Sequence, residues 1–138
     1  MIDSNSPLGA WTLVSMHFVF DDNGERVEVY GPHPDGVIVL TEQGRMAGII
    51  TPGAETQRAN TDAATLLRNM LAYSGPYRIE GDKFVTKVDI AWHPSWVGTE
   101  QVRFFRVEGD RLFIATPPHT LPRYGDRLGH SVLEWKRA

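Results

Sequence analysis

The chain has 138 residues, a formal charge of −3 from 14 Lys plus Arg against 17 Asp plus Glu, and no cysteine. A chain of this length forms one domain, residues 1–138, that removes about 68–70% of its unfolded surface from water without disulfides. The scattered basic residues argue against a nucleic-acid partner, and the absence of cysteine excludes a thiol nucleophile, a thiolate metal site and a disulfide framework.

The N-terminus lacks the basic stretch and apolar run of a secretory signal. No run approaches the roughly 18 apolar residues of a membrane span, and the longest, such as 37–40, have the length of strands. We therefore expect a cytoplasmic protein with no membrane partner.

The first third of the chain is expected to form strands separated by turns. Asn23-Gly24 is typical of a tight hairpin, and Gly44 is free to take a left-handed conformation between two strands. The predicted strands are 9–20, 26–30 (short), 37–41 and 45–51.

The apolar period changes to that of a helix after residue 60. Asn60 or Thr61 can cap its start, and Ser74-Gly75-Pro76 is expected to end it. The apolar residues at helical spacing are Ala63, Leu66, Leu67, Met70 and Leu71.

Strands resume after this helix, and the same tripeptide, Glu-Gly-Asp, forms two of their hairpin turns at 80–82 and 108–110. An open sheet of eight to ten strands in so small a protein would leave costly unpaired edges, so the sheet is expected to close. The sequence thus predicts an all-β, antiparallel up-and-down barrel over about 8–136, with one helix between the third and fourth main strands that covers a barrel end. The remaining predicted strands are 77–79, 83–92, 99–107, 111–116 and 131–135.

Several motifs carry a resemblance to a known family. Gly9-Ala10-Trp11 resembles the Gly-x-Trp signature of lipocalins, where the Trp closes the barrel floor. The fuller pattern resembles the small bacterial and fungal lipocalin-like domain family from about Leu8 to Trp135, and it comprises Gly9-x-Trp11-x-Leu13-x-Ser15, Gly44-Arg45-Met46, Tyr73-Ser74-Gly75-x-Tyr77, Pro94-x-Trp96-x-Gly98-x-x-Gln101-x-Arg103 and Thr116-Pro117-Pro118. The resemblance implies a calycin-type barrel, and related barrels include both carriers of apolar ligands and small cyclases or isomerases of natural-product pathways.

Polar residues on predicted strands are candidates for a site inside the barrel. Period two places Trp11, Ser15 and His17 on one face of the first strand. His17 has two readings, a hydrogen-bonded structural histidine or an acid or base that contacts ligand.

Lys87 and Asp89 share one face of the strand 83–92, and Gln101, Arg103 and Phe105 share one face of 99–107. If these strands form a hairpin centred near Trp96, Asp89 lies opposite Arg103, as a buried pair at a site or as an ion pair of the barrel wall. The opposite face, with Val88 and Trp92, could equally be the inner one.

Aromatic residues with polar tips suit either a pocket mouth or a helix packed over a barrel end. They are Tyr73, Tyr77, Trp92 and Trp96. The spacing of the five histidines predicts no metal, and no phosphate or dinucleotide motif predicts a cofactor.

The leading hypothesis is a module that binds a small, largely apolar or aromatic metabolite within the barrel. The alternative is a cofactor-independent cyclase, isomerase or hydratase of secondary metabolism, acting on a polyketide-like or terpenoid substrate, with His17, Asp89 and Arg103 as catalytic residues. Besides the small molecule, the possible partner is a second copy of the chain, which would form a homodimer. The expected ligand-binding residues are Trp11, Ser15, His17, Tyr73, Tyr77, Lys87, Asp89, Trp92, Trp96, Gln101, Arg103 and Phe105.

Overall fold

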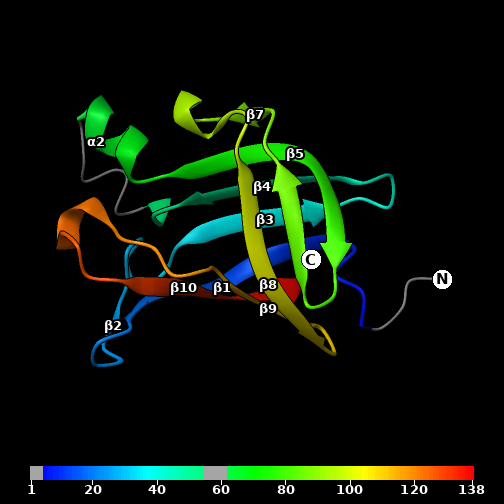
Figure 1. The fold of residues 1–138 in the computed structure, drawn as a ribbon, viewed down its shortest axis with the longest axis horizontal. Helices are drawn as coiled ribbons and strands as arrows, with labels where there is room; N and C mark the ends of the chain where they lie inside the picture. Colours follow the sequence, from blue (N-terminus) through cyan, green and yellow to red (C-terminus); the bar gives the residue numbers. More distant parts are fainter. Residues whose placement is uncertain (1–4, 55–61) are drawn as a thin grey trace.

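The computed structural model describes residues 5–54 and 62–138, which form an antiparallel sheet closed into a barrel (Figure 1). The strands are β1 (Gly9–Phe20), β2 (Arg26–Val27), β3 (Asp35–Leu40), β4 (Arg45–Thr51), β5 (Leu71–Glu80), β6 (Lys83–Lys87), β7 (Ile90–Ala91), β8 (Glu100–Glu108), β9 (Arg111–Ala115) and β10 (Gly129–Arg137). The described helices are α2 (Ala63–Arg68) and the 3₁₀ turns η1 (Pro94–Trp96) and η2 (Pro122–Tyr124).

Eight of these strands make the barrel wall, in the order β1, β3, β4, β5, β6, β8, β9 and β10, and pairing of β10 with β1 closes it. The two short strands are additions, since β2 pairs with β1 and β7 pairs with β5. Closure satisfies the edges that an open sheet would expose. The predicted all-β barrel is confirmed.

Trp11 lies toward the end of the barrel at which β3 turns into β4, because it pairs with Ile38, two residues before β3 ends. Its side chain is fully buried, and its Nε1 donates to the carbonyl of Pro7 at 2.9 Å. The Arg137 guanidinium carbon lies 4.1 Å from the centroid of the Trp11 ring.

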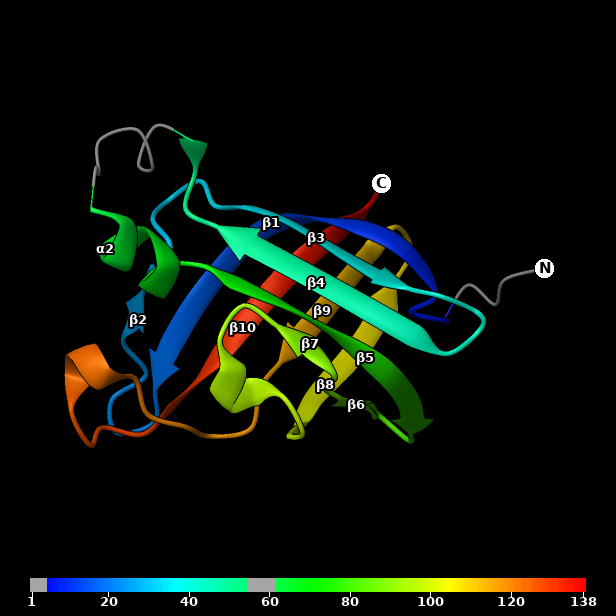
Figure 2. The same ribbon diagram turned by 90° about the horizontal axis from the view of Figure 1, so that it is seen from above.

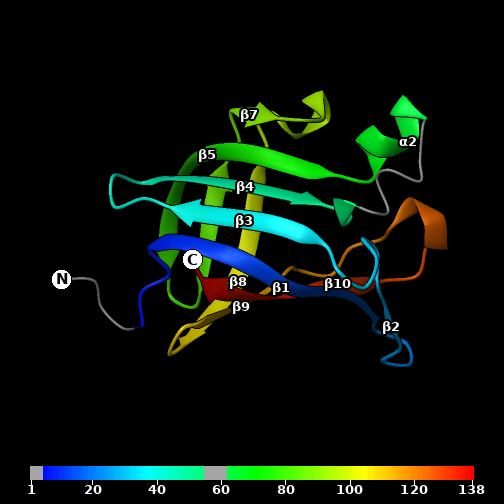
Figure 3. The same ribbon diagram turned by 180° about the vertical axis from the view of Figure 1, so that it is seen from behind.

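Gly81 and Gly109 take φ values of 65° and 60° in the two predicted Glu-Gly-Asp turns. The helix α2 lies at the opposite end, with β2 and η2 (Figure 3).

The helix is shorter than predicted, because α2 ends at Arg68 and Leu71, the last apolar residue of the predicted helix, belongs to β5. Leu71 pairs with Ile50, and Tyr73 pairs with Gly48, so strand pairing with β4 overrides the helical spacing of the sequence. Asp62 caps the helix, its side chain accepting from the backbone N–H of Ala64 at 3.3 Å. The predicted caps, Asn60 and Thr61, lie outside the described residues.

The predicted strand 83–92 is interrupted after Lys87, where the chain crosses closely over Gly75. A Cβ at Gly75 would lie 2.0 Å from the carbonyl oxygen of Lys87, so only glycine permits this approach. The N–H of Asp89 then donates to the carbonyl of Ser74 at 3.0 Å. Because the strand breaks here, β6 and β7 form separate pairings with β5.

A bulge in β1 decides which of its side chains enter the barrel. Leu13 pairs with Trp135, but the next paired residue is Ser15, so Val14 is an extra residue in the strand. A single extra residue reverses the alternation of faces. Met16 therefore packs against the core, whereas His17 shares the outer face with its partner Val132.

Candidate functional site

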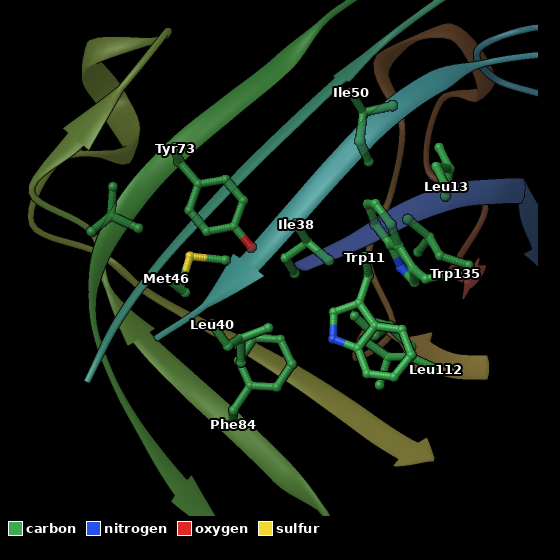
Figure 4. Close-up of a cluster of buried hydrophobic side chains, with 13 residues drawn as sticks. Trp11, Leu13, Ile38, Leu40, Met46, Ile50, Tyr73, Phe84, Leu112 and Trp135 are labelled. Atoms are coloured by element: carbon green, nitrogen blue, oxygen red, sulfur yellow. The ribbon is translucent and has the colours of Figure 1, made fainter. Parts of the chain in front are cut away.

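The barrel interior is mostly filled by its own side chains. Trp11, Leu40, Phe84, Leu112 and Trp135 are each no more than 1% exposed, and Figure 4 shows them within one cluster. A cavity of about 30 Å³ remains beside this cluster. It is lined by apolar residues of five strands together with three side chains that carry polar atoms, namely Tyr73, Arg103 and Trp135.

Arg103 is the cationic side chain that lines this cavity. It pairs with the buried Phe84, and its neighbours on the same face of β8 are Gln101 and Phe105. Its Nη1 donates to the carbonyl of Val102 at 2.8 Å, and its guanidinium carbon lies 5.9 Å from the centroid of the Tyr73 ring. Within the described residues it makes no ion pair with a carboxylate, which leaves its charge available to an anion.

Trp135 contributes a buried donor with no acceptor. The side chain is 1% exposed, and its Nε1 has no hydrogen-bond partner. A buried donor left unpaired costs about 1–3 kcal/mol, so an acceptor in the cavity would recover that energy. Sequence reasoning did not single out Trp135, although period two from Ser131 through Leu133 would have placed it on an inner face.

Gly48, which lines this cavity, was also not among the site residues predicted from the sequence. Gly48 lies on the inner face of β4, and a Cβ there would be 3.8 Å from Met46 Cε and 3.9 Å from Ile38 Cγ1. These are ordinary contacts, so Gly48 leaves open a space that an alanine methyl could fill.

An aromatic cluster, here called the Trp92–Trp96 cap, packs against Tyr73, one of the residues that line the cavity. The Trp96 ring lies 5.2 Å from the Tyr73 ring, and the Trp92 ring lies 4.8 Å from Trp96. The three rings therefore pack in series, with Trp96 between Tyr73 and Trp92. Figure 4 shows the Tyr73 ring extending from β5 into the buried cluster.

Tyr77 lies at the other end of β5, away from Tyr73 and the cavity. Its hydroxyl donates to the carbonyl of Thr41 at 2.7 Å, beside the β3–β4 turn. Its ring contacts Phe84 at 6.4 Å between centroids. Partial burial raises the pKa of the Tyr77 phenol above its usual value.

The predicted shared face of β8, which carries Gln101, Arg103 and Phe105, is confirmed. This face points into the barrel. Phe105 packs against Phe84, with ring centroids 5.9 Å apart. The Gln101 side chain donates through Nε2 to Thr99 Oγ1 at 2.9 Å. By contrast Lys87, at the end of β6, is exposed, while Val88 is 1% exposed.

Asp89 does not pair with Arg103, and the predicted buried ion pair is wrong. Its carboxylate instead accepts two hydrogen bonds from Arg45, at 2.9 Å and 2.6 Å. Both side chains are about half exposed, at 46% and 48%. The Arg45 guanidinium lowers the pKa of the Asp89 carboxyl. The break after Lys87 is the reason, because it removes Asp89 from the hairpin register that the sequence suggested.

Ser15 and His17 line a separate hollow on the outside of the barrel. The bulge at Val14 turns them outward, against strands β8, β9 and β10. The hollow measures about 610 Å³, with Phe104 and Phe113 among its lining residues. The three residues predicted to be catalytic, His17, Asp89 and Arg103, thus lie in three different places.

No group of three or more His, Cys, Asp or Glu side chains arranged to hold a metal ion occurs within the described ranges. In the same part of the chain, no helix has the length and apolar character needed to cross a membrane.

The match to a protein family agrees with the barrel architecture. The family described as lipocalin-like domain matches residues 8–138. No curated protein sequence matches the chain. A similar solved structure is that of the wild-type fluorescent protein UnaG, which is 13% identical, with a TM-score of 0.42 over 96% of this chain and 97% of that chain. The match over nearly the whole sequence shows that this chain belongs to the lipocalin-like domain family.

Proposed function

We propose that this protein binds a small, largely apolar molecule carrying an anionic group, inside the barrel at the cavity lined by Tyr73, Arg103 and Trp135. The observation that carries this proposal is Arg103, a partly buried guanidinium that faces the cavity and has no carboxylate partner among the described residues. A buried charge is retained at a cost unless something pairs with it.

The rest of the cavity supports an apolar body for the ligand. Its lining is mostly aliphatic, with Ile38, Ile50 and Leu133 among the residues that face it. Apolar pockets with a few convergent polar groups are the usual form of small-molecule sites. The Nε1 of Trp135 supplies a second donor for a ligand oxygen.

A ligand larger than about two water molecules must displace side chains, because the free volume is about 30 Å³. Met46 lines the cavity and is unbranched with three rotatable bonds, so it can change rotamer at small cost. The Trp92–Trp96 cap is the cover on the Tyr73 side. We propose that binding moves Met46 and this cap, and leaves the Trp11 end closed.

The catalytic alternative would need an acid and a base near one substrate. The separation of His17, Asp89 and Arg103 removes the grouping on which that alternative relied. Binding is therefore the function that the arrangement of the side chains supports best.

Two fluorescent probes that differ in their anionic group test this proposal. 8-Anilinonaphthalene-1-sulfonate is an apolar aromatic anion, and N-phenyl-1-naphthylamine has the same aromatic body without the sulfonate. Wild type is expected to bind the sulfonate more tightly. Arg103→Met should weaken sulfonate binding about 10- to 100-fold, the equivalent of a charge-assisted hydrogen bond worth about 1.5–3 kcal/mol, and leave binding of the neutral probe unchanged.

Arg106→Met is the matched control, because Arg106 lies on the same strand but faces the outer hollow, 4.2 Å from the Phe113 ring. It should bind both probes as wild type does. Equal sulfonate affinity in the two variants, or a loss confined to Arg106→Met, would place the probe elsewhere and contradict the proposal.

A further inference from the structure

The hollow on the outside of the barrel is much larger than the cavity inside it, and the proposed function does not use it. It measures about 610 Å³ and extends over the outer face of β1, β10, β9 and β8, four strands that lie side by side in Figure 2. Ser15 and His17, which the sequence placed at a ligand site, line this hollow. A volume of several hundred cubic ångströms is typical of sites for small molecules.

The floor of the hollow is a cross-strand row of side chains. The row consists of His17 on β1, Val132 on β10, Ala115 on β9 and Phe104 on β8. The two middle members are smaller than the two at the ends, so the row is lowest at its centre. The ring of Phe104 is 38% exposed. The floor therefore offers an apolar surface to a ligand.

Two side chains at the β1 end of the hollow can donate hydrogen bonds to an anion. Arg26 pairs with Val19, two residues from His17 on the same face, so Arg26 and His17 are diagonal neighbours about 7–8 Å apart. Both line the hollow. Neither forms an ion pair or a side-chain hydrogen bond with any described residue. This end is therefore free to bind a carboxylate.

A free carboxylate lies at the opposite end. Asp82, in the turn between β5 and β6, lines the hollow. Its backbone carbonyl accepts from the N–H of Phe105 at 2.8 Å, which holds the turn against β8. Its side chain has no partner within the described ranges. This end is therefore free to bind a cation.

The other charged side chains of the hollow are already paired. Arg106 donates to Glu108 at 2.9 Å, and Glu134 accepts from Arg111 at 2.9 Å. Among the lining residues, the unpaired charge is confined to the two ends, with donors beside β1 and a carboxylate beside β8. A ligand that is only an anion would leave Asp82 unpaired.

We propose that this hollow binds a short apolar peptide with free ends, its terminal carboxylate at Arg26 and His17 and its terminal ammonium group at Asp82. The strands β1 and β6 lie four spacings apart, about 19 Å along the sheet. The side chains of His17 and Asp82 each reach about 4 Å into this gap, which leaves about 11 Å between their polar atoms. An extended chain advances about 3.3–3.6 Å per residue, so three residues bridge the gap and a single amino acid does not.

The floor determines which side chains the peptide carries. An aromatic side chain at the middle residue packs on the exposed ring of Phe104, in an offset or edge-to-face arrangement. The low centre over Ala115 and Val132 leaves room for that side chain. The tripeptide Ala-Phe-Ala has this length, this middle residue and both free ends.

Titration of the ¹⁵N-labelled protein with Ala-Phe-Ala tests the proposal, with affinity measured from the shifts of backbone amide resonances. Wild type should bind with a dissociation constant below about 1 mM, and the resonances that shift should include those of His17 and Ala115. Amidation of the C-terminus or acetylation of the N-terminus should each weaken binding about two- to fivefold, the range expected for an exposed ion pair.

Two variants assign each end of the peptide. Arg26→Gln should weaken binding of the free peptide by the same factor as amidation, and amidation should then have no further effect. Asp82→Asn should do the same with respect to acetylation. Arg68→Gln is the matched control, because it removes the same charge from α2, outside the hollow, and it should bind all three peptides as wild type does.

Circular dichroism checks that the variants are folded. The absence of any binding at 5 mM peptide, equal affinity of wild type for the free and the blocked peptides, or equal losses in Arg26→Gln and Arg68→Gln would overturn the proposal. Arg103→Met alters the inner cavity and should bind Ala-Phe-Ala as wild type does. The result is therefore independent of the function proposed for the barrel interior.

Discussion

The Arg103 guanidinium carbon lies 5.9 Å from the centroid of the Tyr73 ring, at the inner wall of the barrel. A cation over an aromatic face gains about 0.5–2 kcal/mol, which is less than a carboxylate partner provides in a partly buried position. The pair therefore holds the guanidinium in place without neutralising it. This relationship is the basis of the proposed anion specificity.

Arg103→Met is expected to change the free energy of unfolding by no more than about 1 kcal/mol, because a partly buried cation with no ion pair contributes little net stability. Arg137→Met is expected to lower the free energy of unfolding more than Arg103→Met does. Its guanidinium stacks on Trp11 and donates to the carbonyls of Leu8 and Ser6 at 3.0 Å and 3.2 Å. Its loss should cost about 1–3 kcal/mol in urea denaturation. Similar losses in both variants would show that Arg103 has a structural role instead.

Gly48→Ala is expected to fold with unchanged or higher stability and to weaken probe binding, because its methyl enters the cavity at ordinary contact distance. Gly75→Ala is the matched contrast, since its Cβ would lie 2.0 Å from a backbone oxygen. That variant should lose at least about 2 kcal/mol. Melting temperatures and probe titrations measure both effects. Full probe binding by Gly48→Ala would mean that the ligand does not occupy this space.

Thr86→Val should raise the stability by about 1 kcal/mol. The Thr86 hydroxyl is fully buried and has no hydrogen-bond partner, and valine keeps the shape of the side chain. Thr99→Val should do the opposite, because Thr99 Oγ1 donates to the carbonyl of Trp96 at 2.6 Å and accepts from Gln101. A loss of stability in Thr86→Val, measured by chemical denaturation, would indicate a buried water bound to the hydroxyl.

Tyr30→Phe is expected to reduce the loss of stability at alkaline pH. Burial raises the pKa of the Tyr30 phenol above its usual value of 10, although the Arg123 cation opposes the shift. The folded protein thus prefers the neutral phenol. This stabilising contribution is complete below the unfolded pKa of about 10 and is lost as pH rises through the folded pKa. The free energy of unfolding, followed from about pH 8 to pH 11, should fall less in the variant. Parallel profiles would exclude a buried phenol.

Local patterns predicted most of the barrel, because turns and apolar periods are properties of neighbouring residues. The predicted strand 9–20 coincides with β1, and 45–51 with β4. The helix boundary was wrong because Leu71 is apolar in a place that suits either a helix or a strand, and pairing with Ile50 decides between them.

The candidate site was predicted less well because it depends on contacts between distant residues. Arg103 lies 5.9 Å from the Tyr73 ring and Tyr73 packs against Trp96, whereas the sequence predicted only that each of the three contacts the ligand. His17 does not join them, because both faces of β1 are partly apolar and the sequence therefore gave no sign of the bulge at Val14. Asp89 does not join them either, because the close approach of Lys87 to Gly75 redirects the chain.

The central claim is that an apolar anion binds inside the barrel next to Trp135. The direct measurement is a ¹H–¹⁵N spectrum of the tryptophan indole groups during titration with 8-anilinonaphthalene-1-sulfonate. The Trp135 N–H, which has no acceptor, should shift strongly, whereas the Trp11 N–H, bonded to the Pro7 carbonyl at 2.9 Å, should not move. A Trp135 indole resonance that stays in place at saturation, while the backbone amide resonances of outer-hollow residues such as His17 and Phe113 shift in the same ¹H–¹⁵N spectrum, would contradict the account.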